Sequence, residues 1–260
     1  MPIEFTPPVV IFLSGLGFLV GSFLNVCIIR MPKEESIVWP PSNCVACNTK
    51  IKWYWNIPVL SFLMLRGRCS CCGAKFSPRY LLVELLTPLL FGLVVWHNPE
   101  WKAALFHFYF MGGLIVATFV DIDHWIIPDL VTLPGIVIGF ASSFFLPGLG
   151  ILDSLLGLIF GGGSLLLVGI IYSRWKGIEG IGGGDVKLLA MIGAFLGLSG
   201  VIVTLVVSSL LGSIYGMLLL AIRGGGSKTA VQFGPFLAIG AILAYFAGNE
   251  LVAWYLRPFG

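Results

Sequence analysis

The chain has 260 residues, of which 58% are hydrophobic and only 10% are charged. Soluble domains carry about 25% charged residues, so this composition places the chain among membrane proteins rather than ordinary soluble enzymes. The formal net charge is only +3, and we expect no nucleic-acid partner.

Apolar runs close to the length of about 20 residues that spans a hydrocarbon core recur along the chain. They cover residues 8–29, 80–96, 103–120, 130–146, 152–172, 186–198, 201–222 and 233–256. The first run follows Glu4 rather than basic residues and is longer than a signal-peptide core, so we expect a retained helix. The pattern predicts an all-α polytopic membrane protein with about eight transmembrane helices in contact with membrane lipids.

Lysine and arginine are unevenly distributed between the loops that join these runs. The first long loop and its edges hold Arg30, Lys33, Lys50, Lys52, Arg66, Arg68, Lys75 and Arg79. Loops of the same side hold Arg174, Lys176, Lys187, Arg223 and Lys228, whereas the opposite side holds only Lys102 and Arg257. The positive-inside rule therefore predicts a cytoplasmic first loop and places both termini outside.

The first long loop, residues 31–78, contains two C-x2-C pairs. Cys44 and Cys47 form the first pair, and Cys69 and Cys72 form the second. Two such turns commonly present four thiolates to zinc in a tetrahedral arrangement, so we expect a structural Zn²⁺ site. The metal would supply much of the folding free energy of so small a domain.

Two disulfides are the competing interpretation of the four cysteines, and the reducing cytoplasm disfavours them. Cys71 could replace Cys72 in a tighter C-x-C pair, but the pairing with Cys72 gives both turns the same spacing. Cys27 lies inside the first apolar run and is expected to be a small packing residue.

The twelve acidic residues fall into two groups by position. Those near termini or in loops, expected to be solvated, are Glu4, Glu34, Glu35, Glu100, Asp153 and Glu250. Those within apolar runs or at their cytoplasmic ends are Glu84, Asp121, Asp123, Asp129, Glu179 and Asp185. Ionisable groups near hydrocarbon are costly, so the second group holds the candidate functional residues. Asp129 is also explained as a helix N-cap, and Asp123 as a solvated turn residue.

A glycine-rich stretch, "GIEGIGGGDVKLLAMIGAF", precedes the sixth apolar run. It lacks the Lys-Ser/Thr pair of a phosphate-binding loop and follows a helix rather than a strand, which excludes a dinucleotide turn as well. Asp185 could cap the next helix, but a cap needs no run of glycines. Gly182, Gly183 and Gly184 would instead let a peptide backbone approach the carboxylate closely.

Asp121 and Asp185 both lie at cytoplasmic ends of predicted helices, so they can meet at one depth in the membrane. Two carboxylates that share a proton form the catalytic pair of aspartic proteases. The sequence therefore predicts an aspartic protease site, with Asp121 and Asp185 as the catalytic residues and the three glycines as its backbone.

These motifs together resemble the type IV prepilin peptidases, intramembrane aspartic proteases with a G-x-G-D motif. The resemblance covers nearly the whole chain and rests on "GSFLNVCIIRMP", the two cysteine pairs, "NIPVLSFLMLRGRC", "RYLLVELL", "VDIDHWIIPDLVTLP", "GIGGGDVKLLAMIGAFLG" and "FGPFLAIG". It departs from the family in having Leu81, where proline often follows Arg-Tyr.

The resemblance implies an enzyme of the bacterial inner membrane that cleaves the basic leader of prepilins and pseudopilins after a glycine. It also implies methylation of the new N-terminus with S-adenosylmethionine as methyl donor. Glu84 and Glu179 would then contact the leader's positive charge, although Glu84 could instead pair with Arg79. We expect a first helix in residues 1–30, the zinc domain in 31–78, and a peptidase domain of about seven helices in 79–260.

Two other functions are compatible with the composition. A proton- or ion-coupled transporter would use the two aspartates as a relay, but gives the four cysteines no role. A non-catalytic membrane scaffold would use the zinc domain to dock a partner and leave the acids as helix caps.

Overall fold

The computed structural model describes residues 7–44, 46–98, 100–146, 148–177, 180, 182–223 and 231–257. No β-strand occurs within these ranges, and the predicted all-α class is confirmed. The chain forms two compact units, Met1–Val116 and Ala117–Gly260, and each is described by itself. The predicted division at residues 30 and 78 stays a prediction.

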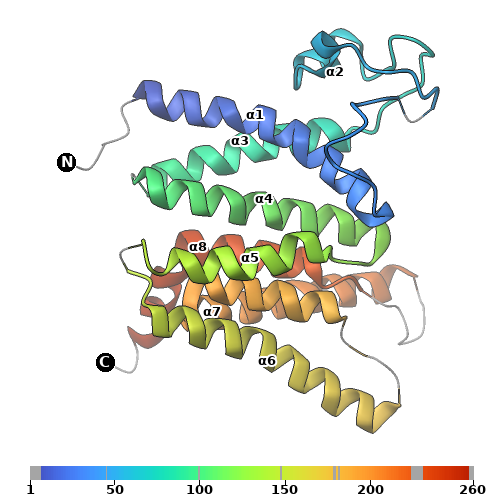
Figure 1. The fold of residues 1–260 in the computed structure, drawn as a ribbon. Helices are drawn as coiled ribbons and strands as arrows, with labels where there is room; N and C mark the ends of the chain where they lie inside the picture. The colour runs from blue at the N-terminus through green and yellow to red at the C-terminus, as the bar shows by residue number, and fades with distance from the viewer. Residues whose placement is uncertain are drawn as a thin grey trace. The chain divides into compact units, whose positions relative to one another are not determined.

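The first unit consists of three long helices, the last of them shared with the second unit, and the loop that carries the cysteines (Figure 1). Its elements are α1 Pro7–Arg30, η1 Met31–Lys33, η2 Trp53–Asn56, α2 Leu60–Met64, α3 Arg79–His97 and the first part of α4 Trp101–His124. The loop lies between the end of α1 at Arg30 and the start of α3 at Arg79, because its polar residues cannot continue a membrane helix.

Glycines on α1 allow α3 to pack closely against it. A side-chain carbon at Gly17 would lie 2.5 Å from Pro88 Cα, and one at Gly21 would lie 3.0 Å from Glu84 Cα. Two small residues one helical turn apart are a common way for membrane helices to approach each other. This contact fixes Glu84 against α1.

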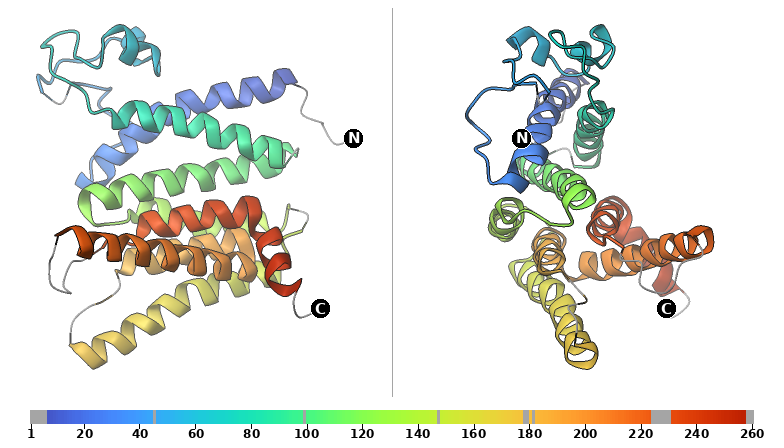
Figure 2. Two further views of the ribbon diagram at one scale, coloured as in Figure 1. Left: turned by 180° about the vertical axis from the view of Figure 1, so that it is seen from behind. Right: turned by 90° about the vertical axis from the view of Figure 1, so that its right-hand side faces the viewer.

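The second unit is a helical bundle in which α7 contacts three other helices (Figure 2). Its elements are the end of α4, α5 Asp129–Ser142, α6 Ile151–Lys176, α7 Gly183–Arg223 and α8 Gly234–Leu256. α7 is interrupted at Gly197, whose φ of 68° and ψ of −172° are not helical. The two parts of α7 run in opposite directions, so both of its ends lie at the same end of the bundle as the C-terminal end of α6 (Figures 1 and 2).

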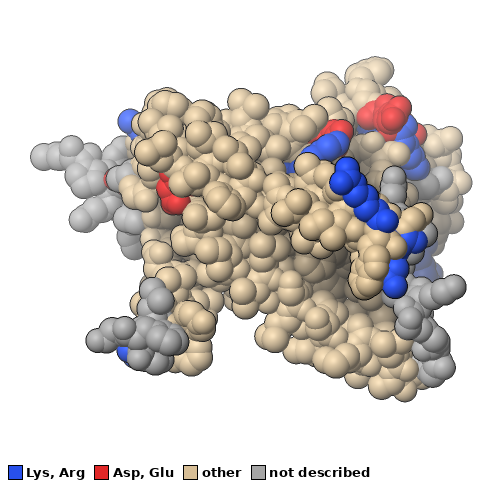
Figure 3. Space-filling model, turned by 90° about the horizontal axis from the view of Figure 1, so that it is seen from below, with Lys and Arg blue, Asp and Glu red and all other residues tan. Residues whose placement is uncertain are grey.

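Six helices in the described part of the chain are long and apolar enough to cross a membrane. Two features account for the difference between these six helices and the eight predicted crossings. α7 is one helix that contains two of the predicted runs, and α5, with 14 residues, is shorter than the six. Large apolar side chains such as Leu152, Val206 and Trp254 are more than half exposed. The face drawn in Figure 3 has a broad uncharged middle, as a lipid-facing surface requires.

Two α6 side chains satisfy the backbone at the break in α7. The Asp153 carboxylate accepts a hydrogen bond from Leu198 N at 3.1 Å, and the Ser154 hydroxyl donates to Ala194 O at 2.7 Å. A broken membrane helix leaves such groups without intrahelical partners. The expectation that Asp153 is solvated is wrong, because it acts as an N-cap supplied by a neighbouring helix.

Replacing Ser154 by alanine should therefore destabilise the bundle. We expect the free energy of unfolding to fall by about 1–3 kcal/mol, the cost of leaving the buried Ala194 carbonyl without a hydrogen bond. Thermal unfolding in detergent measures it. Ser164→Ala is the matched control, because Ser164 bonds only to Gly161 O within α6. An equal loss in both variants would contradict this role for Ser154.

Candidate active site and metal centre

Asp121 lies near the C-terminal end of α4 and is only 6% exposed. Its Oδ2 accepts a hydrogen bond from Gly234 N at 3.2 Å, at the start of α8. The Gln232 side chain donates to the backbone carbonyls of Asp121 and Ile122 at 2.7 and 3.1 Å. The segment before α8 therefore holds Asp121 from both its side chain and its backbone.

Gly234 has a steric reason to be glycine. A side-chain carbon there would lie 2.7 Å from Asp121 Oδ2 and 3.2 Å from Ile127 Cδ1. Any larger residue would displace the carboxylate or open the contact between α4 and α8. The sequence singled out "FGPFLAIG" only as part of the resemblance, and its contact with Asp121 becomes visible in the fold.

Asp185 is the third residue of α7 and lies in its first turn. It therefore does not occupy the position before the helix that an N-cap takes. The first turn carries the positive end of the helix dipole, which favours a carboxylate there. Asp185 is half-buried, and the residue before it, Gly184, packs against Ile127. Ile127 also lies beside Gly234, whose N–H bonds to Asp121. The structure thus brings together the two aspartates that the sequence predicts as a pair.

The three glycines before Asp185 differ in what surrounds them. A side-chain carbon at Gly184 would lie 3.0 Å from Ile127 Cβ and 3.3 Å from its backbone nitrogen. At Gly183 it would meet nothing within 4 Å, and at Gly182 only Asp185 Oδ2 at 3.4 Å. Packing explains Gly184 alone, whereas Gly182 and Gly183 leave open space beside the carboxylate.

An ion pair connects the first turns of α5 and α7. Lys187 Nζ lies 2.7 and 2.8 Å from the two carboxylate oxygens of Asp129, and both side chains are partly exposed. α5 has no side-chain cap, and its N-cap position is Pro128 rather than Asp129. The N-cap interpretation of Asp129 is therefore wrong. Its ion pair instead connects α5 to Lys187 of α7, two residues after Asp185.

The two acids suggested for leader binding have different positions. Glu84 lies on α3, is 9% exposed and accepts a hydrogen bond from Val59 N at 2.8 Å through Oε2. Glu179 lies outside the described residues.

The two cysteine turns of the first unit share one backbone pattern. Cys44 N donates to Thr49 O at 3.0 Å and Asn48 N to Cys44 O at 2.8 Å. The second turn repeats both bonds, from Cys69 N to Ala74 O at 2.8 Å and from Gly73 N to Cys69 O at 3.0 Å. Cys72 therefore corresponds to Cys47, which decides the pairing that the sequence left open.

The four sulfurs of Cys44, Cys47, Cys69 and Cys72 lie within 4.8 Å of one another. Cys44 and Cys72 are 3.9 Å apart, far beyond a disulfide bond of about 2.05 Å. Tetrahedral zinc with bonds of about 2.3 Å would place its sulfurs about 3.8 Å apart. The cluster fits a metal ion of this kind, whereas Cys71 is exposed and not part of it.

Local hydrogen bonds favour the thiolate form at two of the four cysteines, Cys47 and Cys69. Those with the side chain and backbone of Thr49 lower the pKa of the Cys47 thiol to about 6. The backbone N–H groups of Cys72 and Cys71 likewise lower the pKa of Cys69.

Comparison with known families matches both halves of the chain. Residues 16–98 match the bacterial peptidase A24 N-terminal domain, and residues 108–217 match the type IV leader peptidase family. No solved structure gives a match.

Curated proteins named prepilin leader peptidase/N-methyltransferase resemble the chain over most of its length. The one from Pseudomonas aeruginosa is 37% identical over 266 residues, which cover 93% of this chain and 91% of that protein. The one from Myxococcus xanthus is 41% identical over 88% of this chain and 69% of its own length. The one from Neisseria gonorrhoeae is 35% identical over 93% of this chain and 92% of its own.

Proposed function

This chain belongs to the type IV leader peptidase family, and from that premise we propose that it removes the leader peptide of type IV prepilins and pseudopilins. It then methylates the new amino terminus. The observation that supports the proposal is that Gly184, next to Asp185, and Gly234, whose N–H bonds to Asp121, both pack against Ile127. The transporter and scaffold alternatives find no support in the family match.

The two aspartates perform the hydrolysis in complementary states. The Gly234 N–H stabilises a charged carboxylate on Asp121. We assign Asp121 to take the proton from the attacking water, and the protonated partner Asp185 to polarise the scissile carbonyl. The open space beside Gly182 and Gly183 gives an extended peptide access to Asp185.

The substrate's chemistry suits an active site at a membrane boundary. A prepilin with its apolar helix in the bilayer and its basic leader in the cytoplasm presents the scissile bond at the inner interface. We assign the cysteine loop and the aspartates to the cytoplasmic side and both termini to the periplasmic side, since the basic residues concentrate in the corresponding loops.

Methyl transfer requires a donor, for which we propose S-adenosylmethionine. When bound, it supplies an electrophilic methyl group. The amine lone pair forms the new N–C bond, the electrons of the broken C–S bond stay on sulfur, and the amine releases a proton. The ion held by Cys44, Cys47, Cys69 and Cys72 is assigned as structural Zn²⁺. Glu84 and Glu179 remain candidates for leader binding.

The proposal is tested by incubating the purified protein in lipid with a prepilin and S-adenosylmethionine. Mass spectrometry should show a pilin that has lost its leader and gained one methyl group. An unprocessed prepilin under conditions in which the protein is folded would overturn the proposal.

Replacing Gly234 by alanine should reduce cleavage because the added carbon displaces the Asp121 carboxylate. A displacement of about 1 Å in a catalytic group costs roughly 100-fold in rate, and we expect a loss of about 10- to 100-fold in kcat/KM. Gly248→Ala, on the same helix, is the control, because nothing lies within 4 Å of its side-chain position. Equal rates for the Gly234 variant and the wild type would show that this contact does not position Asp121.

A further inference from the structure

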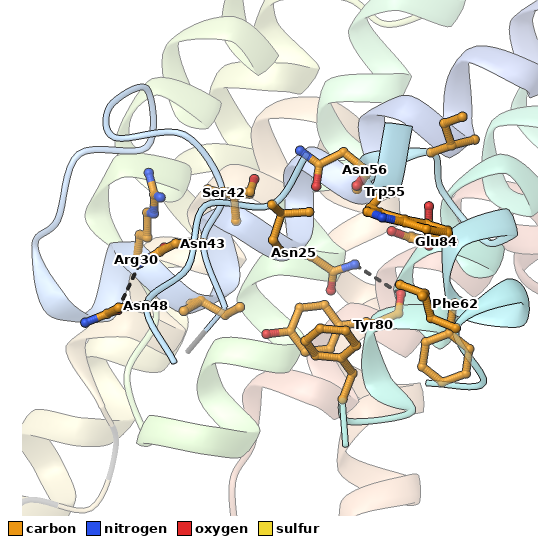
Figure 4. Close-up of a pocket in the computed structure, with 18 of the residues that line it drawn as sticks. Asn25, Arg30, Ser42, Asn43, Asn48, Trp55, Asn56, Phe62, Tyr80 and Glu84 are labelled. Atoms are coloured by element: carbon orange, nitrogen blue, oxygen red, sulfur yellow. Dashed lines mark hydrogen bonds between the residues drawn. The ribbon is translucent and has the colours of Figure 1, made fainter. Parts of the chain in front are cut away.

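The first unit contains a cavity that the aspartate site does not use. Its volume is about 300 Å³, the lower end of the range for small-molecule sites. Its walls come from α1, the cysteine loop, η2, α2 and the first turns of α3 (Figure 4). Three of its polar residues, Asn25, Arg30 and Glu84, are more than nine-tenths buried.

One end of the cavity combines a carboxylate with an aromatic ring. Glu84 and Trp55 lie beside each other there, and Asn56 is close by (Figure 4). The bond from Val59 N occupies Glu84 Oε2 and keeps the side chain in place. A buried carboxylate next to an indole ring is suited to a ligand cation, since both groups attract positive charge.

The opposite end is basic and polar. Arg30 lies there with Asn43 and Asn48 (Figure 4). Its Nη1 donates a hydrogen bond to Ser36 O at 2.9 Å. A guanidinium suits a ligand carboxylate. Tyr80 between the two ends, and Phe62 near the Glu84 end, offer aromatic surface for a planar ring (Figure 4).

We propose that this cavity binds the methyl donor S-adenosylmethionine. The inference rests on the proposed methyltransferase function and gives it a place in the chain. The ligand carries a sulfonium cation, an amino-acid carboxylate and a flat adenine ring. Glu84 and Trp55 suit the sulfonium cation, and Arg30 suits the carboxylate. Tyr80 and Phe62 suit the adenine ring.

The charges of the lining favour this ligand over the basic leader. Arg30 and Lys33 line the cavity together with Glu35 and Glu84, so its formal charge is balanced. The two basic residues offset the attraction that Glu35 and Glu84 would exert on a leader with several positive charges. This assignment replaces leader binding as the proposed role of Glu84 and leaves Glu179 as the candidate for that role.

The test is direct binding to the full-length protein in lipid, measured by calorimetry with S-adenosylmethionine and with S-adenosylhomocysteine. Trp55→Ala should weaken S-adenosylmethionine by at least about ten-fold and S-adenosylhomocysteine by less, and Trp55→Phe should restore most of the affinity. Glu84→Gln should weaken S-adenosylmethionine by about ten-fold and the uncharged thioether S-adenosylhomocysteine by less. Unchanged zinc content shows that each variant is folded.

Trp39→Ala and Glu100→Gln are the matched controls, because both residues are exposed and neither lines the cavity. Both should bind like the wild type. If the wild type binds S-adenosylmethionine and the cavity variants bind it equally well, the location is overturned while the methyltransferase function stands. If the wild type binds none, the methyltransferase function itself is overturned.

Discussion

Asp121→Asn and Asp185→Asn each reduce prepilin cleavage by at least about 10³-fold, because neither amide can replace a carboxylate in a pair that activates water and protonates an oxygen. The isosteric change keeps the volume of the buried Asp121 side chain and the position of Asp185 in the first turn of α7. Initial rates with a purified prepilin measure the loss.

Asp123→Asn is the matched control, since Asp123 lies two residues from Asp121 but is exposed. We expect its cleavage rate to stay within about two-fold of the wild type, as for most surface substitutions. Both catalytic variants should keep their zinc and their insertion in the membrane. Prepilin cleavage at the wild-type rate by either catalytic variant would contradict the protease assignment.

Replacing Cys44 and Cys72 by serine removes the metal and unfolds the loop between α1 and α3. Zinc binding in small domains contributes about 10–16 kcal/mol at neutral pH, and nearly all of it is folding free energy. We expect about one zinc per wild-type chain by elemental analysis and almost none in the variant. The variant loop should also be cut rapidly in limited proteolysis.

Cys71→Ser is the control for this experiment, because Cys71 lies outside the sulfur cluster although it adjoins Cys72. Its zinc content should equal that of the wild type. A wild-type protein without metal, or a Cys71 variant that loses it, would contradict the assignment of the four ligands.

Local patterns in the sequence predict most of the fold. The lengths of the apolar runs locate the membrane helices, since about 20 residues are needed to cross the hydrocarbon core. The separation of the runs at residues 198 and 201 also indicates the interruption of α7 at Gly197. The partners of that interruption were not predictable, because Asp153 and Ser154 reach it from a different helix.

The candidate site divides in the same way. Acids near hydrocarbon are costly, so position alone singled out a group of six acids. The glycines before Asp185 and the place of Asp121 at a helix end then selected these two as the candidate pair. The expected role of Asp129 was wrong because it assumed a partner in its own helix, and that of Asp153 was wrong because it assumed water. In the fold, Asp129 meets Lys187 of α7 and Asp153 meets the backbone at Leu198.

The sequence by itself determined the class of protein and predicted a cysteine cluster and a pair of aspartates, because each depends on residue type and short-range spacing. Only the tertiary structure decided that Gly234 holds Asp121, that Cys72 rather than Cys71 completes the sulfur cluster, and that Glu84 faces a cavity with Trp55. These contacts join residues far apart in the chain or depend on the direction of a single turn. The packing of the helices fixes these contacts, and no local sequence pattern specifies that packing.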